Sequence, residues 1–451
     1  MSQFWSASAL LPSGWAKNVR FTVANGLIAS IETHTPARPD DEAHQITLPG
    51  LANVHSHAFQ RGMAGLAEHR SGDSTDNFWS WREVMYRFLD RLTPDDVEAI
   101  AAMAYAEMLE TGYTHVGEFH YLHNDPQGEA YRDPAEMASR IAAAAQATGI
   151  GLTLLPVCYA HSNFGGQAPS HGQRRFIHDL DSFARLLEAC RPLLSKGDQL
   201  GIAPHSLRAV TPHELAALIA MHPHGPIHIH AAEQQKEVQD SLAFSGKRPV
   251  EWLLDHAALD QRWCLIHATH LNDSETDALA ACGAVAGLCP MTEANLGDGI
   301  FPALRFLEAG GRIGTGTDSN ILIDPAQELR ALEYSQRLAH EARNVLASDT
   351  HSSVARRLLG DALTGGAQAM GIAPGLAVGH AADFVTLNPA HTALHGRSGD
   401  QLLDSWIFAA RNTCIDTVWK RGRKLVSNGR HLDSANVTAR YLMVLDRIMA
   451  E

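Results

Sequence analysis

Short apolar segments alternate with helix-like stretches through the middle of the chain. The apolar segments are Leu48–Val54, Thr114–Glu118, Leu152–Cys158, Leu200–Pro204, Ile227–His230, Trp263–His267, Ala284–Leu288 and Arg312–Thr317. The stretches between them, rich in Ala, Leu and charged residues, include Pro94–Thr111, Pro134–Thr148, Leu180–Leu194, Pro212–Met221, Asp273–Ala281 and Ala326–Leu338. Strands that alternate with helices in this way are typical of βα units. The pattern therefore predicts an α/β fold, a (β/α)8 TIM-like barrel with insertions.

A doubly wound open sheet is the rival architecture. Such a sheet usually carries a glycine-rich phosphate loop after its first strand. Here the first strand is followed by H-S-H-A-F-Q-R. The sequence therefore favours the barrel.

The two ends of the chain carry a different pattern. Strand-like runs occur at Val19–Thr35, Ala382–Leu387 and Thr417–Val426, with turn signals at Asn25-Gly26 and Asn428-Gly429. We expect them to form a small β-sandwich from both termini, flanking the barrel. The predicted boundaries are 1–47 and 378–430 for the two parts of the sandwich, 48–377 for the barrel and 431–451 for a C-terminal helix.

Composition narrows the class of protein and of partner. The 451 residues, 45% hydrophobic and 19% charged, are enough for one large and one small globular core. A net charge of −14 without clustered Lys or Arg argues against nucleic acid or an anionic membrane as partner. With no apolar run near the roughly 20 residues that span a bilayer, and six cysteines without C-x-x-C spacing, we expect a cytoplasmic protein with a small-molecule substrate.

Histidines at the ends of predicted strands suggest a metal site. His55 and His57 are two residues apart, so both side chains project from one face of the first strand. Neutral imidazole is a common ligand of zinc-like dications. An H-x-H pair alone is weak evidence, because two polar residues at a strand end would give the same pattern.

The fifth predicted strand carries H-I-H-A-A-E. His230 would be a third ligand at the rim, and Glu233, three residues on, could reach a water at the metal without binding the metal. His228 faces the same way one layer deeper. A hydrogen-bonded histidine in the barrel interior is the better interpretation of His228.

The sixth and eighth predicted strands end in His267 and in G-T-G-T-D-S. Asp318 follows glycines at 314 and 316 that would leave space in a crowded interior. Its carboxylate could bind a metal and accept a proton, and the alternative is a helix N-cap. His270 points differently from His267 and is interpreted as structural or as a neighbour of the site.

Together these motifs resemble those of the amidohydrolase superfamily. The matching segments are L-P-G-L-A-N-V-H-S-H, H-I-H-A-A-E, L-I-H-A-T-H and G-T-G-T-D-S. The resemblance implies one divalent ion, with zinc expected, held by His55, His57, His230 and Asp318, because I-A-P-H-S-L-R stands where binuclear members carry a bridging Lys or Glu. Iron or another divalent ion stays open. The resemblance also implies that Glu233, His267 and Asp318 are the catalytic residues.

Segments outside the metal motifs suggest the substrate. H-A-F-Q-R-G, N-F-W-S-W-R-E-V-M-Y and G-E-F-H-Y-L-H-N resemble the N-formimino-L-glutamate deiminase family of bacterial histidine degradation. That resemblance implies hydrolysis of formiminoglutamate to N-formylglutamate and ammonia. The two substrate carboxylates need cationic or hydrogen-bonding partners. The candidates are Gln60, Arg82, Tyr121, His205 and Arg208, with a surface salt bridge as the alternative for Arg82, ordinary packing for Tyr121, and Arg61 a weaker candidate.

Two other functions stay open at this point. A purine or pterin deaminase, such as a guanine deaminase, would share the metal set, but the stretch that starts at Cys289-Pro290 is longer than the C-P-x-S-N-L-like run expected there. A catalytically silent metal-binding scaffold would lack one acid-base residue, and none is missing. Family habit implies a homodimer.

Overall fold

Nine short parallel strands form the barrel of the computed structural model, which describes residues 2–70, 76–410 and 414–450. The strands are β5 (Leu51–Ser56), β6 (Tyr113–His120), β7 (Gly151–Cys158), β8 (Gln199–Leu200), β9 (Ala203–Pro204), β10 (Ile227–Ala231), β11 (Trp263–His267), β12 (Val285–Leu288) and β13 (Arg312–Thr315). β13 pairs with β5, and bridges at Ile202 and Ser206 join the β8–β9 segment to β10. The sheet therefore closes, with β8 and β9 together in the place of the fourth strand.

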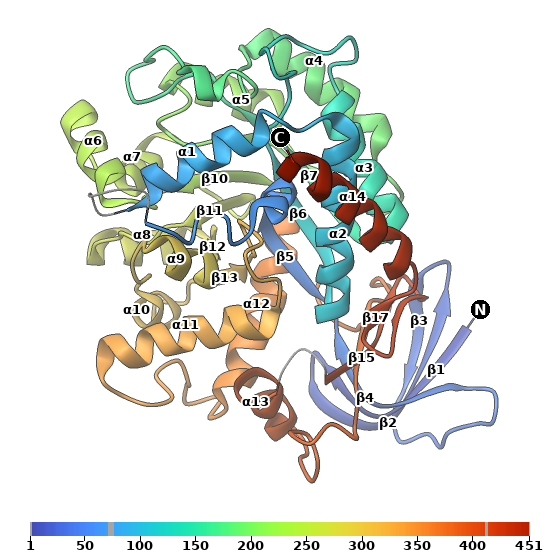
Figure 1. Ribbon diagram of the computed structural model, residues 1–451. Helices are drawn as coiled ribbons and strands as arrows, with labels where there is room; N and C mark the ends of the chain where they lie inside the picture. Colours follow the sequence, from blue (N-terminus) through green and yellow to red (C-terminus); the bar gives the residue numbers. More distant parts are fainter. Residues whose placement is uncertain (1, 71–75, 411–413, 451) are drawn as a thin grey trace.

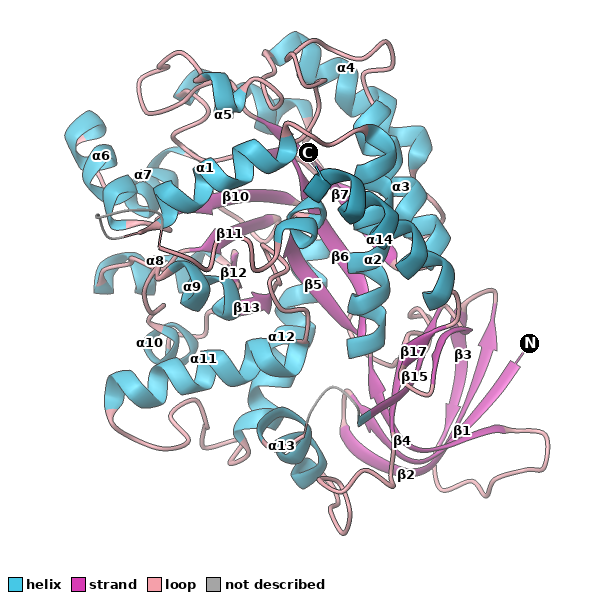
Figure 2. Cartoon of the chain, viewed as in Figure 1, coloured by secondary structure: helices cyan, strands magenta, loops and turns pink. Residues whose placement is uncertain are grey.

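Helices surround this sheet (Figure 1, Figure 2). They are α1 (Phe78–Leu89), α2 (Pro94–Thr111), α3 (Glu136–Thr148), α4 (Leu180–Cys190), α5 (Pro212–Met221), α6 (Gln235–Ser245), α7 (Pro249–His256), α8 (Asp273–Cys282), α9 (Pro290–Leu296), α10 (Ala303–Glu308), α11 (Pro325–His340) and α12 (Val354–Met370), with short 3-10 turns at Ala58–Met63, His171–Gln173 and Arg191–Leu193. Several of these helices start with a capping box, in which Thr93 is the N-cap residue of α2 and Thr211 that of α5. The barrel expected from the sequence is confirmed.

The lower interior of the barrel is filled by apolar side chains and by the end of α12. Val54, Ile266 and Cys264 from the strands pack with Ala369 and Met370. The carbonyl of Met370 accepts a hydrogen bond from Thr153 Oγ1. The end of α12 thus closes this part of the barrel, and the predicted site residues lie at the other end of the strands, where their carboxyl termini lie.

Both chain ends contribute to a second, eight-stranded sheet, at the lower right of Figure 1. Its strands are β1 (Ser2–Leu11), β2 (Gly14–Ala24), β3 (Leu27–Glu32), β4 (Glu42–Pro49), β14 (Phe384–Leu387), β15 (Ile415–Lys420), β16 (Arg423–Ser427) and β17 (Arg430–His431). Phe4 on β1 touches Trp419 on β15 at 4.6 Å between ring centroids, although β4 and β14 lie between those strands. The expected two-layered terminal domain is therefore one sheet that curls over its own apolar face.

Two details of the strands differ from the sequence expectation. The N-terminal strand β1 was not predicted. The expected strand Leu48–Val54 is divided at Gly50, where the chain passes from the terminal sheet into the barrel; a Cβ there would lie 2.3 Å from the Thr114 side chain. The residue boundaries of the domains stay a prediction.

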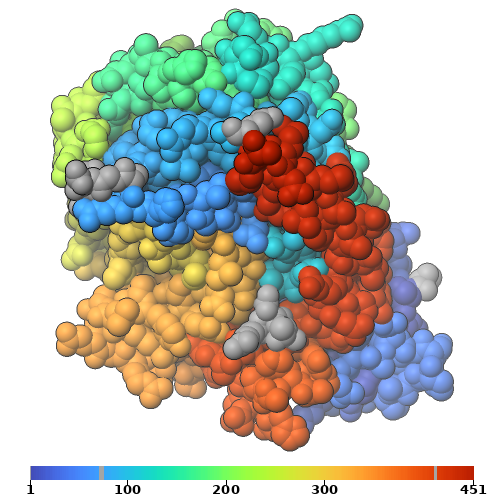
Figure 3. Space-filling view, in the orientation of Figure 1, coloured from blue at the N-terminus to red at the C-terminus, as the bar shows by residue number. Residues whose placement is uncertain are grey.

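The C-terminal helix α14 (Ser434–Ala450) lies against α2 on the outside of the barrel. In Figure 3 it forms a continuous surface with the N-terminal barrel segments. A further helix, α13 (Asp400–Phe408), packs on α11 and α12. Among the described residues, no helix is long and apolar enough to cross a membrane.

Candidate metal centre and active site

The first and eighth barrel strands bring three predicted ligands together. Nε2 of His55 and Nε2 of His57 each lie 3.3 Å from Oδ1 of Asp318. The backbone supports the contact, because the N–H of His57 donates to the carbonyl of Asp318 at 2.9 Å. All three residues are buried.

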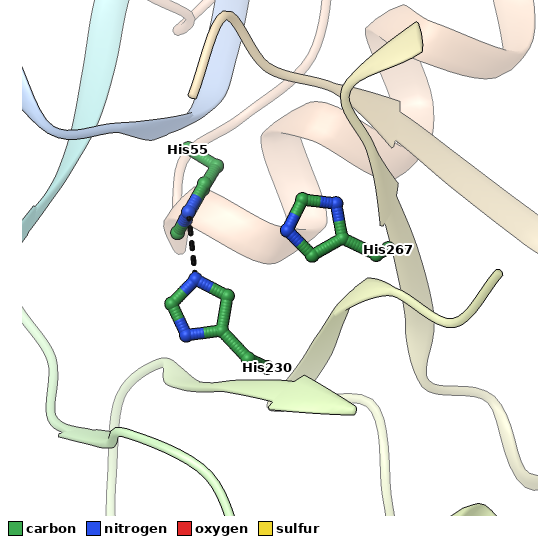
Figure 4. A group of neighbouring side chains, drawn as sticks. All are labelled: His55, His230 and His267. Carbon is green, nitrogen blue, oxygen red and sulfur yellow. Dashed lines mark hydrogen bonds between the residues drawn. The ribbon is translucent and has the colours of Figure 1, made fainter. Parts of the chain in front are cut away.

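His230 completes the cluster from β10. Its Nε2 lies 3.1 Å from Nε2 of His55, and the ring of His267 faces the same point (Figure 4). Nδ1 of His230 lies 3.1 Å from the carbonyl of His205, and Nδ1 of His57 lies 2.9 Å from that of Phe119. A carbonyl only accepts, so each Nδ1 carries the proton and each Nε2 presents a lone pair to the centre.

The backbone around Asp318 is held in an unusual conformation. Its φ of +44° is in the left-handed region, which non-glycine residues rarely adopt. Asn320 fixes this turn, since its Nδ2 donates to the carbonyls of His57 and Asp318. At Gly316 a Cβ would lie 2.7 Å from the backbone N of His55, so only glycine allows this approach. Asp318 caps no helix; Asp324 caps α11.

Glu233 and His267 lie beside the cluster. Nε2 of His267 is 3.8 Å from Oε1 of Glu233 and 3.8 Å from Oδ2 of Asp318. Glu237 accepts hydrogen bonds from the N–H groups of Ala232 and Glu233, which fixes the loop after β10. An acid, a base and an imidazole therefore face one small volume.

The electrostatics of the cluster suit a bound dication. Burial lowers the pKa of His55 to about 3 and also lowers the pKa values of His57 and His230, so all three rings are neutral at pH 7. Burial alone would raise the pKa of Asp318, but the hydrogen bond with His55 and the positive charge of His267 outweigh it and hold that pKa below its usual value. Neutral imidazoles and an ionised carboxylate are the forms that bind metal.

The pKa values of Glu233 and His267 are raised rather than lowered. Burial raises the pKa of Glu233 to about 7, which suits proton exchange at neutral pH. Burial acts to lower the pKa of His267, but the charge of Glu233 and the hydrogen bond with Glu293 raise it to about 10.

The donor set fits a divalent metal ion. Nε2 of His55 lies 3.1 Å from Nε2 of His230 and 3.3 Å from Oδ1 of Asp318, so these electron-pair donors lie close enough together for a cation to bind them. Three imidazole nitrogens and one carboxylate oxygen match the ligand types of zinc. The four predicted ligands are thus brought together, and they could hold a divalent ion.

A pocket opens above this cluster. Its lining includes the predicted Gln60, Arg82, Tyr121, His205 and Arg208 together with His57, His230, Glu233, His267 and Asp318. Nε2 of Gln60 donates to the hydroxyl of Tyr121 at 2.8 Å. The structure therefore gathers every predicted substrate-binding residue around one pocket.

The two arginines of the pocket have donors left over. Nε of Arg82 and Nε of Arg208 are buried without a hydrogen-bond partner among the described residues. Both guanidinium groups lie near the indole of Trp79, at 4.5 and 5.9 Å from its ring centroid. Buried N–H groups are normally paired, so both cations are suited to receive an anionic ligand from the pocket.

Three other histidine or arginine candidates lie outside the pocket lining. His228 is buried one layer deeper, with Nε2 2.8 Å from the carbonyl of Ala369. His270 is half-buried, with Nδ1 2.8 Å from Nε2 of Gln235. Arg61 forms an ion pair with Glu107 at 2.6 Å.

Sequence reasoning missed some residues of the site. Tyr86, Tyr159 and Phe176 line the pocket, and Glu293 contacts His267. The aromatic residues give no sequence signal, because aromatic side chains are common in any core. Glu293 gave a weak one: an acid lies just after Cys289-Pro290, at the start of a helix that follows a barrel strand.

Comparisons with known proteins match the chain from end to end. Residues 46–425 match the amidohydrolase family, and residues 1–45 match the N-terminal domain of formimidoylglutamate deiminase HutF. Formimidoylglutamate deiminase of Pseudomonas aeruginosa is 50% identical over the whole of both chains. A crystal structure of an amidohydrolase from Brucella melitensis, 54% identical, superposes with a TM-score of 0.96 over 100% of both chains.

A more distant structure shares the fold alone. An adenosine deaminase from Xanthomonas campestris with bound zinc is 22% identical, with a TM-score of 0.80 over 100% of this chain and 98% of its own. Fold, site geometry and the family match agree with one another. The chain belongs to the amidohydrolase family.

Proposed function

We propose that this chain is a formimidoylglutamate deiminase, which hydrolyses N-formimino-L-glutamate to N-formyl-L-glutamate and ammonia in histidine degradation. One observation carries the choice of substrate: two guanidinium groups with unpaired buried N–H donors line the same pocket as the acid-base groups. In a substrate with two carboxylates and a C=N carbon, the carboxylates would pair with the guanidinium groups and the C=N carbon would meet the acid-base groups. The 50% identity to the Pseudomonas aeruginosa deiminase supports the same choice.

His55, His57, His230 and Asp318 would hold one divalent ion, and their mixed nitrogen and oxygen donors favour zinc. Such an ion lowers the pKa of water toward roughly 7 and so supplies hydroxide at neutral pH. The remaining steps belong to side chains of this chain.

Three side chains would accept, donate or share the protons of the reaction. The carboxylate of Asp318 accepts the proton that the attacking water loses. As oxygen adds to the formimino carbon, the C=N electron pair moves to nitrogen, and Glu233 delivers a first proton there. The proton held by Asp318 and the hydroxyl proton of the tetrahedral intermediate then supply the second proton of the leaving nitrogen and restore Glu233. The C–N bond breaks as the formyl C=O forms, and ammonia leaves. His267, 3.8 Å from both carboxylates, donates to the tetrahedral intermediate as charge develops.

The pocket residues would orient the substrate. Arg82 and Arg208 each bind a carboxylate, which places the formimino group at the metal end. Gln60, Tyr121 and His205, which line the same pocket, add hydrogen bonds. Because both carboxylates are held, the carbon is presented in one orientation.

Ammonia release tests the proposal. The purified zinc-loaded chain is assayed with formiminoglutamate and, in parallel, with guanine. We expect a much larger kcat/KM for formiminoglutamate. A larger value for guanine would mean that the chain is a purine deaminase, and no release from either would favour a metal-binding scaffold. Formation of a homodimer and a cytoplasmic location are proposed with this function, and sedimentation of the purified chain tests the first.

A further inference from the structure

Glu293 lies beneath the imidazole of His267, on the side away from the pocket. Its Oε1 is 3.2 Å from Nδ1 of His267 and accepts the N–H of Cys289 at 2.8 Å. The carboxylate is 7% exposed and comes from the first turn of α9. The two hydrogen bonds join the end of β12 to the end of β11.

His267 needs this support because of its backbone. Its φ of +67° is in the left-handed region, and Ala268 after it is at +48°. His267 is the last residue of β11 and pairs with Ala231 of β10 but with no residue of β12, so the sheet holds it from one side alone. A carboxylate on Nδ1 fixes both the orientation of the ring and the position of one proton.

The opposite ring nitrogen faces the chemistry. Nε2 of His267 lies 3.8 Å from a carboxylate oxygen of Glu233 and the same distance from one of Asp318. A half-turn of the ring about its Cβ–Cγ bond would exchange Nε2 with Cε1 and Nδ1 with Cδ2, and so point carbon at the substrate. Glu293 is the hydrogen-bonding group on the far edge that opposes this rotation.

We propose that Glu293 is a positioning residue for the deimination, acting through His267 by holding its Nε2 toward the substrate. The inference rests on the proposed function, in which His267 stabilises the intermediate. A purely structural role is the competing account, since the bond to Cys289 N–H also anchors the start of α9. The two accounts differ in whether the effect of Glu293 depends on His267.

A double-mutant cycle separates them. The variants are Glu293→Ala, Glu293→Gln, His267→Asn and both double mutants, each loaded with zinc, with kcat and KM measured by ammonia release from formiminoglutamate. Glu275→Ala is the matched control: Glu275 is another buried carboxylate that accepts a backbone N–H at a helix start, at Asn272, but it lines no part of the pocket. Melting temperature and zinc content are measured for every variant.

We expect Glu293→Ala to lower kcat by about 10- to 100-fold with KM nearly unchanged, as for other residues that orient a functional histidine. Glu293→Gln keeps an acceptor oxygen and should recover most of the loss. In the His267→Asn background neither change should lower kcat further by more than about twofold. Glu275→Ala should lower the melting temperature and leave kcat unchanged.

Equal losses of kcat in the presence and absence of His267, or a folded and zinc-loaded Glu293→Ala enzyme with the parental kcat, would overturn the inference. If Glu293→Ala does not fold, the Gln variant decides by the same comparison: a small loss of kcat that vanishes in the His267→Asn background supports it, and a loss that persists there refutes it. If the parent itself releases no ammonia from formiminoglutamate, the proposed function fails and the inference fails with it.

Discussion

Replacing Arg208 by Met tests how the pocket selects its substrate. Arg208 is 5% exposed, and its Nε has no partner among the described residues. Burial acts to lower its pKa, but the carboxylates of Glu237 and Glu233 help to keep it above the usual value, so the side chain stays charged. The substrate carboxylate is thus the natural partner for its fork of N–H groups.

The size of the loss follows from the hydrogen bonds that disappear. A bidentate contact comprises two charge-assisted bonds, each contributing about 1.5 kcal/mol or more. Their loss costs about 3 kcal/mol of transition-state binding, which corresponds to a roughly 100-fold lower kcat/KM at 1.36 kcal/mol per tenfold. Met is of similar length, so the packing beneath the pocket is retained.

The assay compares ammonia release from formiminoglutamate and from analogues in which one carboxylate is an amide. The loss caused by Arg208→Met should nearly vanish for the analogue that lacks the carboxylate bound by Arg208. Arg61→Met is the control, because Arg61 is paired with Glu107 outside the pocket lining. An Arg208→Met enzyme within about threefold of the parent, or an equal loss for all substrates, would refute the assignment.

Four further predictions follow from the same geometry. Glu233→Gln should lower kcat by ~10²–10⁴-fold with normal zinc content, and a loss below tenfold would contradict its role as proton shuttle. Removal of zinc by a chelator should abolish ammonia release and lower the melting temperature, because a ligand that binds the native state stabilises it. Added zinc should restore both. A metal-free enzyme with the parental melting temperature would contradict the proposed metal site. Gly316→Ala should destabilise the chain by about 1–3 kcal/mol in urea unfolding and reduce zinc content, because its Cβ would meet backbone N of His55 at 2.7 Å; an unchanged midpoint would contradict this. Burial raises the pKa of Asp324 from 3.8 to about 6, so the folded state binds its proton more tightly than the unfolded state does. The associated free energy of unfolding is therefore lost as pH rises from about 4 through 6. Asp324→Asn, which keeps the helix cap, should flatten that part of the plot of stability against pH, and an unaltered plot would refute the shift.

The sequence predicted the elements whose patterns are local. The helices at Pro94–Thr111 and Pro212–Met221 have the predicted bounds, because proline at the first helical position and threonine before it mark their starts. The strand Trp263–His267 also agrees residue for residue. Strand β1 was not predicted, and the break at Gly50 depends on a contact with Thr114 that no local pattern encodes.

The candidate site divides in the same way. Residues at strand ends, such as His57 and Asp318, could be found because the barrel fold places every strand end at one rim. Glu293 left only a weak signal in the sequence, and the contacts of Trp79 left none, because both depend on which loop folds over which side chain. The left-handed backbone at His267 is likewise a property of the assembled rim and leaves no mark in the sequence.

The first and last barrel strands meet at a seam, where one pair, Thr315 with Asn53, and the bridge between Ser56 and Asp318 join them. His55 and His57 lie on one side of this seam and Asp318 on the other, about 260 residues later in the chain. During synthesis the N-terminal pair therefore leaves the ribosome long before its carboxylate partner exists. The full set of ligands forms only after the barrel has closed, so tight binding of the ion must wait for closure. The bound ion then links the first strand of the barrel to the last.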